Sequence, residues 1–117
     1  MTLIISLANA DQIIQLSDRR LTRAGKLFDD STNKAGHVLC DDASFVFSFT
    51  GLAKVSSRHS STTRWLLEAF YDCLQGHHGY AAMVPKFADY AAQHFRMAPA
   101  VTGLPPSDRR LTVMMTG

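Results

Sequence analysis

Three residues near the N-terminus have the types and the spacing of a hydrolytic site. Thr2, Asp18 and Lys34 follow one another at intervals of sixteen residues. Once Met1 is removed, a threonine at the chain start carries both a hydroxyl nucleophile and a free α-amino group that can accept the hydroxyl proton. A nearby ammonium would lower the pKa of that amine and favour the developing alkoxide, and the carboxylate would keep the lysine charged and in place. This pattern predicts an amine-assisted threonine nucleophile.

A β-hairpin at the N-terminus would bring two of these residues together. Residues 2–7 and 12–16 are short runs rich in β-branched side chains, and Ala8-Asn9-Ala10-Asp11 between them favours a tight turn. A hairpin returns the chain to its starting end, so we expect Asp18 to lie beside Thr2. Both runs contain adjacent isoleucines instead of strict alternation, which predicts a sheet covered on both faces.

The next part of the chain predicts two more strands. We expect residues 17–33 to form a polar connection with a turn at 23–25, and residues 34–40 to form a strand that ends in a turn at 41–44. Residues 45–49 carry three phenylalanines at alternate positions, which predicts a strand with one strongly apolar face.

The pattern then changes to helical spacing. Residues 61–74 predict a helix with Ser61 or Thr62 as its N-cap and Gly76 as its terminator. A second helix is expected over 83–95, with Pro85 in its first turn. After a proline-containing loop, residues 111–115 predict one further strand.

This order of elements predicts an α+β fold that is incomplete, with strands, two helices and then a terminal strand. We expect residues 1–117 to form the N-terminal portion of one domain, because the last strand has no successor in the sheet. The hexapeptide Ser-Asp-Arg-Arg-Leu-Thr occurs at 17–22 and again at 107–112. The first copy is expected to follow a strand and the second to precede one, so the repeat does not predict a duplicated structural unit.

Four parts of the chain resemble a known family. Thr2-Leu3-Ile4-Ile5, Ser17-Asp18-Arg19-Arg20-Leu21-Thr22, Lys34 and Thr50-Gly51 are similar to the N-terminal half of proteasome β-type subunits and of their bacterial relative HslV. Both are N-terminal-nucleophile (Ntn) hydrolases. The resemblance implies a four-layer α-β-β-α sandwich, of which this chain would supply roughly the first half.

The resemblance also implies roles for individual residues. Thr2 would be nucleophile and base, with Asp18 and Lys34 as its supporting pair. The backbone N–H of Gly51, which follows a predicted strand, would donate to the oxyanion. The residues implied in substrate binding are Thr22, whose backbone would lie along an extended peptide, and Phe49 and Ala53, near the side-chain pocket.

The predicted function is a proteasome-like threonine hydrolase that cleaves a peptide or amide bond through an acyl ester on Thr2. No metal or organic cofactor is expected, and the family implies a ring-forming homo-oligomer. Two alternatives stay open, namely a non-catalytic scaffold subunit of the same fold and an Ntn amidase acting on a small molecule. We expect the activity to belong to a longer parent protein and the isolated chain to be inactive.

Composition argues against several other classes of protein. A net charge of +2 is low for a dedicated nucleic-acid binder, and the basic run from Arg19 to Lys26 contains no aromatic residues, so we expect a solvated loop there. Cys73, His77 and His78 are too few for a metal site. Two cysteines and the absence of a basic signal-peptide start predict a cytoplasmic protein without a membrane span.

Overall fold

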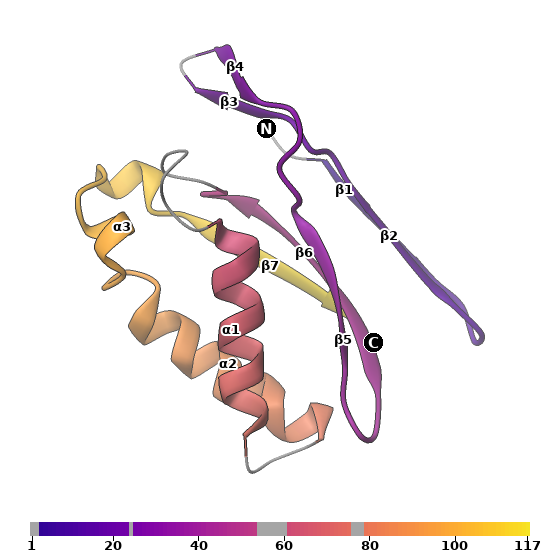
Figure 1. The fold of residues 1–117 in the computed structure, drawn as a ribbon. Coiled ribbons are helices and arrows are strands. Elements are labelled where there is room, and N and C mark those ends of the chain that lie inside the picture. The colour runs from indigo at the N-terminus through magenta and orange to yellow at the C-terminus, as the bar shows by residue number, and fades with distance from the viewer. Residues whose placement is uncertain (1–2, 24, 54–60, 76–78) are drawn as a thin grey trace.

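The protein has a mixed α+β fold (Figure 1). The computed structural model describes residues 3–23, 25–53, 61–75 and 79–117. Six strands come first, followed by the helices and a seventh strand. The strands are β1 (Ile4–Ala8), β2 (Ile13–Ser17), β3 (Leu21–Arg23), β4 (Lys26–Asp29), β5 (Ala35–Leu39), β6 (Ser44–Gly51) and β7 (Leu111–Thr116). The helices are α1 (Thr62–Leu74), α2 (Tyr80–His94) and the short α3 (Pro99–Thr102), and a 3₁₀ turn spans Pro106–Asp108.

An antiparallel sheet of β5, β6 and β7 carries the core, with β6 in its centre. The three phenylalanines of β6 lie on one face, as the alternation predicts, and Phe45, Phe47 and Phe49 are 1%, 0% and 0% exposed. Phe70 of α1 packs edge-on against Phe45, with ring centroids 5.3 Å apart, and also contacts Phe87 of α2 at 4.2 Å. Burial of these aromatic side chains removes apolar surface from water and so stabilises the fold.

Both long helices begin at a capping side chain. Ser61 accepts a hydrogen bond from the backbone N–H of Arg64, which confirms the predicted start of α1. The start of α2 differs from the prediction, because the helix begins at Tyr80 instead of residue 83 and Pro85 is therefore its sixth residue. The carboxylate of Asp42 accepts from the Tyr80 N–H at 2.8 Å, and this long-range cap extends the helix toward its N-terminus. α1 ends at Leu74, and Gly76, its predicted terminator, lies outside the described residues.

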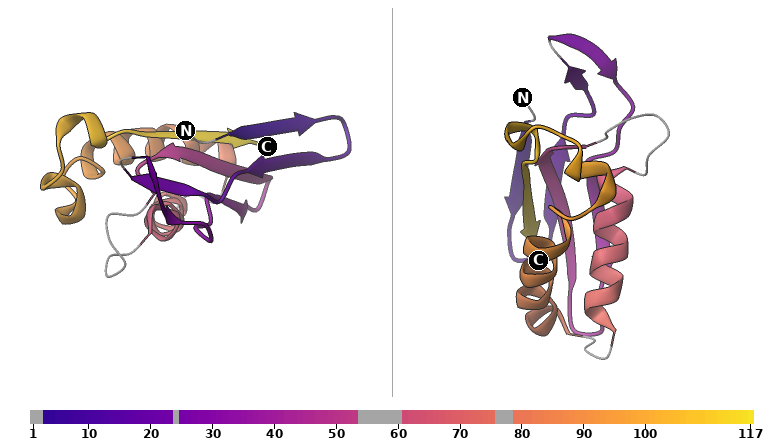
Figure 2. Two further views of the ribbon diagram at one scale, coloured as in Figure 1. Left: turned by 90° about the horizontal axis from the view of Figure 1, so that it is seen from above. Right: turned by 90° about the vertical axis from the view of Figure 1, so that its left-hand side faces the viewer.

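The β1–β2 hairpin lies against the face of the sheet opposite the helices (Figure 2). The hairpin itself is confirmed, with Ile4 opposite Ser17 and Ala8 opposite Ile13. Its inner face contacts β5 and β6, and the hydroxyls of Ser6 and Thr116 are 3.1 Å apart. The prediction of burial on both faces is wrong within the described residues, because packing covers one face only. The outer face exposes Leu3, Ile5, Leu7, Ile14 and Leu16.

A second hairpin occupies much of the segment that the sequence predicts as a polar connection. β3 and β4 pair around the turn at Gly25, whose φ is +75°, and a bulge shifts the register between Leu21 and Thr22. The turn is where the sequence places it, but the two strands are not predicted. They are short, and the adjacent Leu27 and Phe28 of β4 do not alternate with polar residues. The arginines at 19 and 20 therefore flank a strand instead of lying in a long loop.

The two copies of the hexapeptide both lead into a strand. In the first copy Leu21 and Thr22 open β3, and in the second Leu111 and Thr112 open β7. The first copy also follows a strand, as predicted, since Ser17 ends β2. None of the described helices is both long and apolar enough to cross a membrane.

Candidate functional site

The centre of the candidate site is the buried ammonium group of Lys34. The residue lies just before β5, and its side chain is only 1% exposed. Its Nζ atom lies 3.2 Å from Oδ1 of Asp18 and donates to the carbonyl oxygen of Arg20 at 2.7 Å. A buried charge is tolerated only when it is paired and hydrogen-bonded, and both conditions are met here.

The two hairpins and the sheet bring these groups together. The N–H of Asp18 donates to the carbonyl of Leu3 at 3.2 Å, so Asp18 lies beside the start of the first strand, as the hairpin predicts. Lys34 is fixed from the other side, because its carbonyl accepts from the N–H of Phe49 on β6 at 3.1 Å. Thr2 lies outside the described residues. The structure therefore brings Asp18 and Lys34 into contact next to the residue that follows Thr2.

Gly51 ends β6 in a conformation that other residues rarely adopt. Its φ is +104°, and a Cβ atom built there would lie 2.1 Å from the carbonyl oxygen of Arg110. The N–H of Leu52 donates to the same oxygen at 2.8 Å. Both the backbone angle and the close approach therefore require glycine at this position.

The hydrogen-bonding pattern of β6 orients the Gly51 amide. Phe49 bonds to the β5 side, whereas Leu52 bonds to the β7 side. Since backbone groups alternate in direction along a strand, the N–H of Gly51 is directed toward the β5 side, where Lys34 lies. Asp18, Lys34 and Gly51 thus belong to one region of the molecule.

Two threonines at the start of α1 hold this region in place. The Oγ1 of Thr62 donates to the carbonyl of Leu52 at 2.5 Å, and the Oγ1 of Thr63 donates to the carbonyl of Asn33. These bonds tie the residues next to Gly51 and next to Lys34 to the same helix turn. From the sequence, Thr62 suggests only a helix cap, and nothing there indicates that Thr63 is a positioning residue.

The predicted substrate-binding residues fall in two different environments. Thr22 is exposed in β3, two residues after the Arg20 carbonyl that accepts from Lys34, and it is opposite Leu27 of β4. Phe49 and Ala53 are 0% and 3% exposed and belong to the hydrophobic core. A substrate could contact their side chains only if this part of the core opened.

The cysteines do not offer a competing nucleophile. Burial raises the pKa of the Cys40 thiol, and the carboxylates of Asp42 and Asp41 raise it further. Burial also raises the pKa of Cys73, with a further increase from Asp72 that Lys86 opposes. Both thiols are therefore less ionised near neutral pH than an ordinary cysteine. In the described ranges, no group of three or more His, Cys, Asp or Glu residues could hold a metal ion, and His77 and His78 lie outside those ranges.

Comparisons with models of protein families, with curated proteins and with solved structures give no match to this chain. The functional interpretation therefore depends on the geometry of the site and on the residues themselves.

Proposed function

We propose that this chain contains the catalytic residues of an N-terminal-nucleophile hydrolase, in which Thr2 attacks the carbonyl carbon of a peptide or amide. The observation that supports the proposal most directly is the buried ammonium of Lys34, 3.2 Å from the Asp18 carboxylate. Asp18 is in turn hydrogen-bonded to Leu3, the residue that follows the proposed nucleophile. A buried, paired cation next to the chain start is the arrangement that an amine-assisted nucleophile needs.

The proposed reaction begins with removal of Met1, which exposes the α-amino group of Thr2. That amine accepts the proton of the Thr2 hydroxyl as Oγ attacks the substrate carbonyl carbon. The resulting oxyanion accepts a hydrogen bond from the Gly51 N–H, and the Lys34 ammonium stabilises the negative charge near Oγ. When the intermediate collapses, the amine leaving group takes the proton and an ester to Thr2 remains. Water then hydrolyses the ester, which releases the acid and restores the hydroxyl.

The main competing interpretation is that the Lys34–Asp18 pair is purely structural. The same contacts would then serve only to fasten β5 to the β2–β3 connection. In that case the chain would be the scaffold type of subunit, and Thr2 would have no special reactivity. The two interpretations differ in the chemistry of Thr2, so an experiment must probe that residue directly.

The test is covalent labelling of the protein, or of a longer parent that contains these residues, with a peptide epoxyketone. Intact-mass measurement first establishes that the chain begins at Thr2, and peptide mapping then locates the adduct. We expect the label on Thr2 in the wild type and no label in Thr2→Ala. Equal labelling of the Thr2→Ala variant would contradict the proposal.

A matched pair of variants separates catalysis from folding. Asp18→Asn should slow labelling of Thr2 by about tenfold to a hundredfold, because the lysine loses its charged partner. Asp108→Asn, the same change in the second copy of the hexapeptide, should leave the rate unchanged. A wild-type labelling rate in a folded Asp18→Asn variant would favour the structural interpretation.

The assembly of the active protein separates the two hydrolase alternatives. A ring-forming peptidase would be active only as a large homo-oligomer, and an amidase would be active as a monomer or dimer. Sedimentation of the labelled species measures this size directly. We propose the peptidase, because β3, which contains Thr22, pairs with β4 on one side and with no described strand on the other, where an extended peptide could pair.

A further inference from the structure

The first turn of α1 lies where β6 ends and β5 begins (Figure 1). Thr62 and Thr63 are consecutive residues of this turn, and both are buried, at 7% and 9% exposed. The Oγ1 of Thr62 donates to the carbonyl of Leu52, and the Oγ1 of Thr63 donates to the carbonyl of Asn33. Neighbouring side chains of a helix point about 100° apart, so one turn can reach two segments at once.

Each of these bonds ends one residue away from a group that the proposed function uses. Asn33 directly precedes Lys34, whose ammonium pairs with Asp18. The Asn33 carbonyl and the Lys34 N–H belong to one rigid peptide plane, so a bond to this carbonyl also fixes the backbone of the lysine. Leu52 directly follows Gly51, whose N–H is proposed to bind the oxyanion. The same helical turn therefore holds the backbone beside both groups.

The turn that makes these bonds is itself held in place. The N–H of Thr62 donates to the carbonyl of Ala53 at 3.0 Å. Farther along the same buried face of α1, Leu66 is fully buried, and Phe70 packs against Phe47 of β6 with ring centroids 5.0 Å apart. A displacement of the turn would disrupt this close packing, so the turn is a rigid support for both hydroxyls.

We propose that these two threonines are positioning residues for the reaction at Thr2. Thr63 acts through the ammonium of Lys34, and neither threonine touches the substrate. Thr62 acts through the backbone at Gly51. This inference rests on the proposed function, because both roles are defined by that reaction. A displacement of about 1 Å at a reacting group can slow a reaction by about a hundredfold, so two buried hydrogen bonds can control the rate without any contact with substrate.

The test measures the rate at which the peptide epoxyketone labels Thr2 over a range of reagent concentrations. Thr63→Val and Thr62→Val keep the approximate shape of each side chain but remove its hydroxyl. We expect each substitution to lower the maximal labelling rate by about tenfold or more. The concentration that gives half of the maximal rate should not change, because peptide binding is not affected. Thr63→Ser and Thr62→Ser keep the hydroxyl and should restore most of the rate.

Arg64→Ala is the matched control in the same helical turn. The Arg64 side chain is exposed and pairs with Glu68, so this variant should be labelled like wild type. Thr63→Ala and Thr62→Ala repeat the measurement with smaller side chains, and circular dichroism verifies that each variant is folded. Wild-type maximal rates in the folded valine and alanine variants would overturn the proposal, as would a loss of rate that serine does not restore.

A double-mutant comparison assigns each threonine to its group. Because Thr63 acts through Lys34, Thr63→Val should slow labelling much less in Asp18→Asn, where the ammonium has already lost its partner, than in wild type. Thr62→Val should slow labelling by the same factor in both backgrounds. Equal effects of Thr63→Val in both backgrounds would overturn its proposed action through Lys34. Absence of label on Thr2 in the wild type would instead reject the hydrolase itself, and this inference with it.

Discussion

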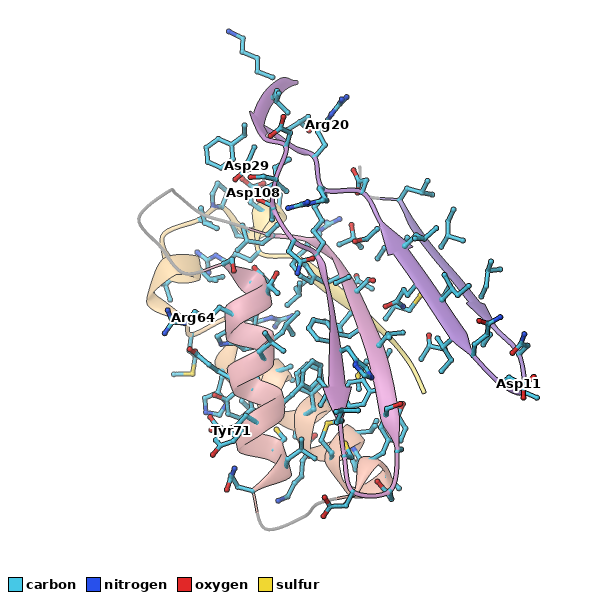
Figure 3. The ribbon with its side chains drawn as sticks, turned by 45° about the vertical axis from the view of Figure 1, so that its right-hand side comes forward. Asp11, Arg20, Asp29, Arg64, Tyr71 and Asp108 are labelled. Atoms are coloured by element: carbon cyan, nitrogen blue, oxygen red, sulfur yellow. The ribbon has the colours of Figure 1, made fainter. Side chains whose placement is uncertain are left out.

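The two copies of Ser-Asp-Arg-Arg-Leu-Thr place identical residues in two parts of the fold, and their local structures agree in several respects. In each copy the leucine opens a strand and packs against the core. In each, the first arginine donates to backbone carbonyls of a neighbouring loop, Arg19 to Ser31 and Arg109 to Leu104 and Thr102. Figure 3 shows Arg20 and Asp108, one from each copy, toward the same end of the molecule, far from Asp11 at the tip of the β1–β2 hairpin.

The copies differ in what the surrounding fold supplies to them. The carbonyl of the second arginine accepts from the ammonium of Lys34 in the first copy and from the N–H of Leu52 in the second. Asp18 pairs with that same ammonium, whereas Asp108 is exposed and accepts from the neighbouring Ser107 hydroxyl. The comparison teaches that the hexapeptide alone makes no site. The buried ammonium of Lys34, just before β5, makes one copy part of a candidate site, and the other copy remains a structural connection.

Of the substitutions that test the difference between the two copies, removal of the buried Lys34 ammonium should have the largest effect on stability. We expect Lys34→Ala to lower the free energy of unfolding by about 3–5 kcal/mol, because a cavity opens and the Arg20 carbonyl and the Asp18 carboxylate lose their donor. Urea denaturation measures this change. Lys26→Ala, at an exposed position of β4, is the matched control and should stay within about 0.5 kcal/mol of wild type. Similar losses of unfolding free energy in both variants would show that the buried contacts of Lys34 do not stabilise the fold.

The junction of the second copy with β6 should be the next most sensitive position. Gly51→Ala would force a Cβ against the Arg110 carbonyl at an unfavourable φ, and we expect a loss of about 2–4 kcal/mol in thermal or urea unfolding. Gly103→Ala provides the comparison, since a Cβ there meets no atom within 4 Å. That variant should unfold like wild type. A Gly51→Ala protein of wild-type stability would mean that the junction is not tight.

The aspartates test the comparison most directly. Asp18→Asn keeps an oxygen acceptor but removes the charge that pairs with Lys34, so we expect a loss of about 1–2 kcal/mol. Asp108→Asn changes an exposed residue and should alter stability by less than about 0.5 kcal/mol. Both values come from urea denaturation under identical conditions. Equal effects of the two substitutions would remove the distinction between the copies.

The first arginine of each copy, Arg19 or Arg109, should give the smallest difference in stability between the two copies. Arg109→Ala removes two hydrogen bonds to carbonyls in a partly buried setting, and we expect a loss of about 1–2 kcal/mol. Arg19→Ala removes one bond at an exposed position and should cost about 0.5 kcal/mol. Thermal unfolding of the two variants side by side measures the difference. A larger loss of stability for Arg19→Ala than for Arg109→Ala would contradict this prediction.

Much of the fold could be predicted from the sequence where local patterns were strong. The alternating phenylalanines of β6, the Asn-containing turn of the β1–β2 hairpin and the Ser61 cap of α1 all appear where the patterns predict them. The start of α2 was not predictable, because its cap is Asp42, which lies 38 residues earlier in the chain. β3 and β4 were also missed although the turn between them was predicted, since strands of three and four residues are too short to show a clear apolar alternation.

The amino-acid sequence by itself determined the period of β6 and of the two long helices, and the spacing that groups Thr2, Asp18 and Lys34 as candidates, because periodicity and residue type are local properties. Only the tertiary structure decided that Lys34 is buried, that it pairs with Asp18 and not with Asp108, and that Gly51 lies against Arg110. It also decided that one face of the first hairpin stays exposed, whereas the adjacent isoleucines predicted burial on both. Burial and pairing depend on which distant segments pack together, and identical hexapeptides therefore acquire different partners in one chain.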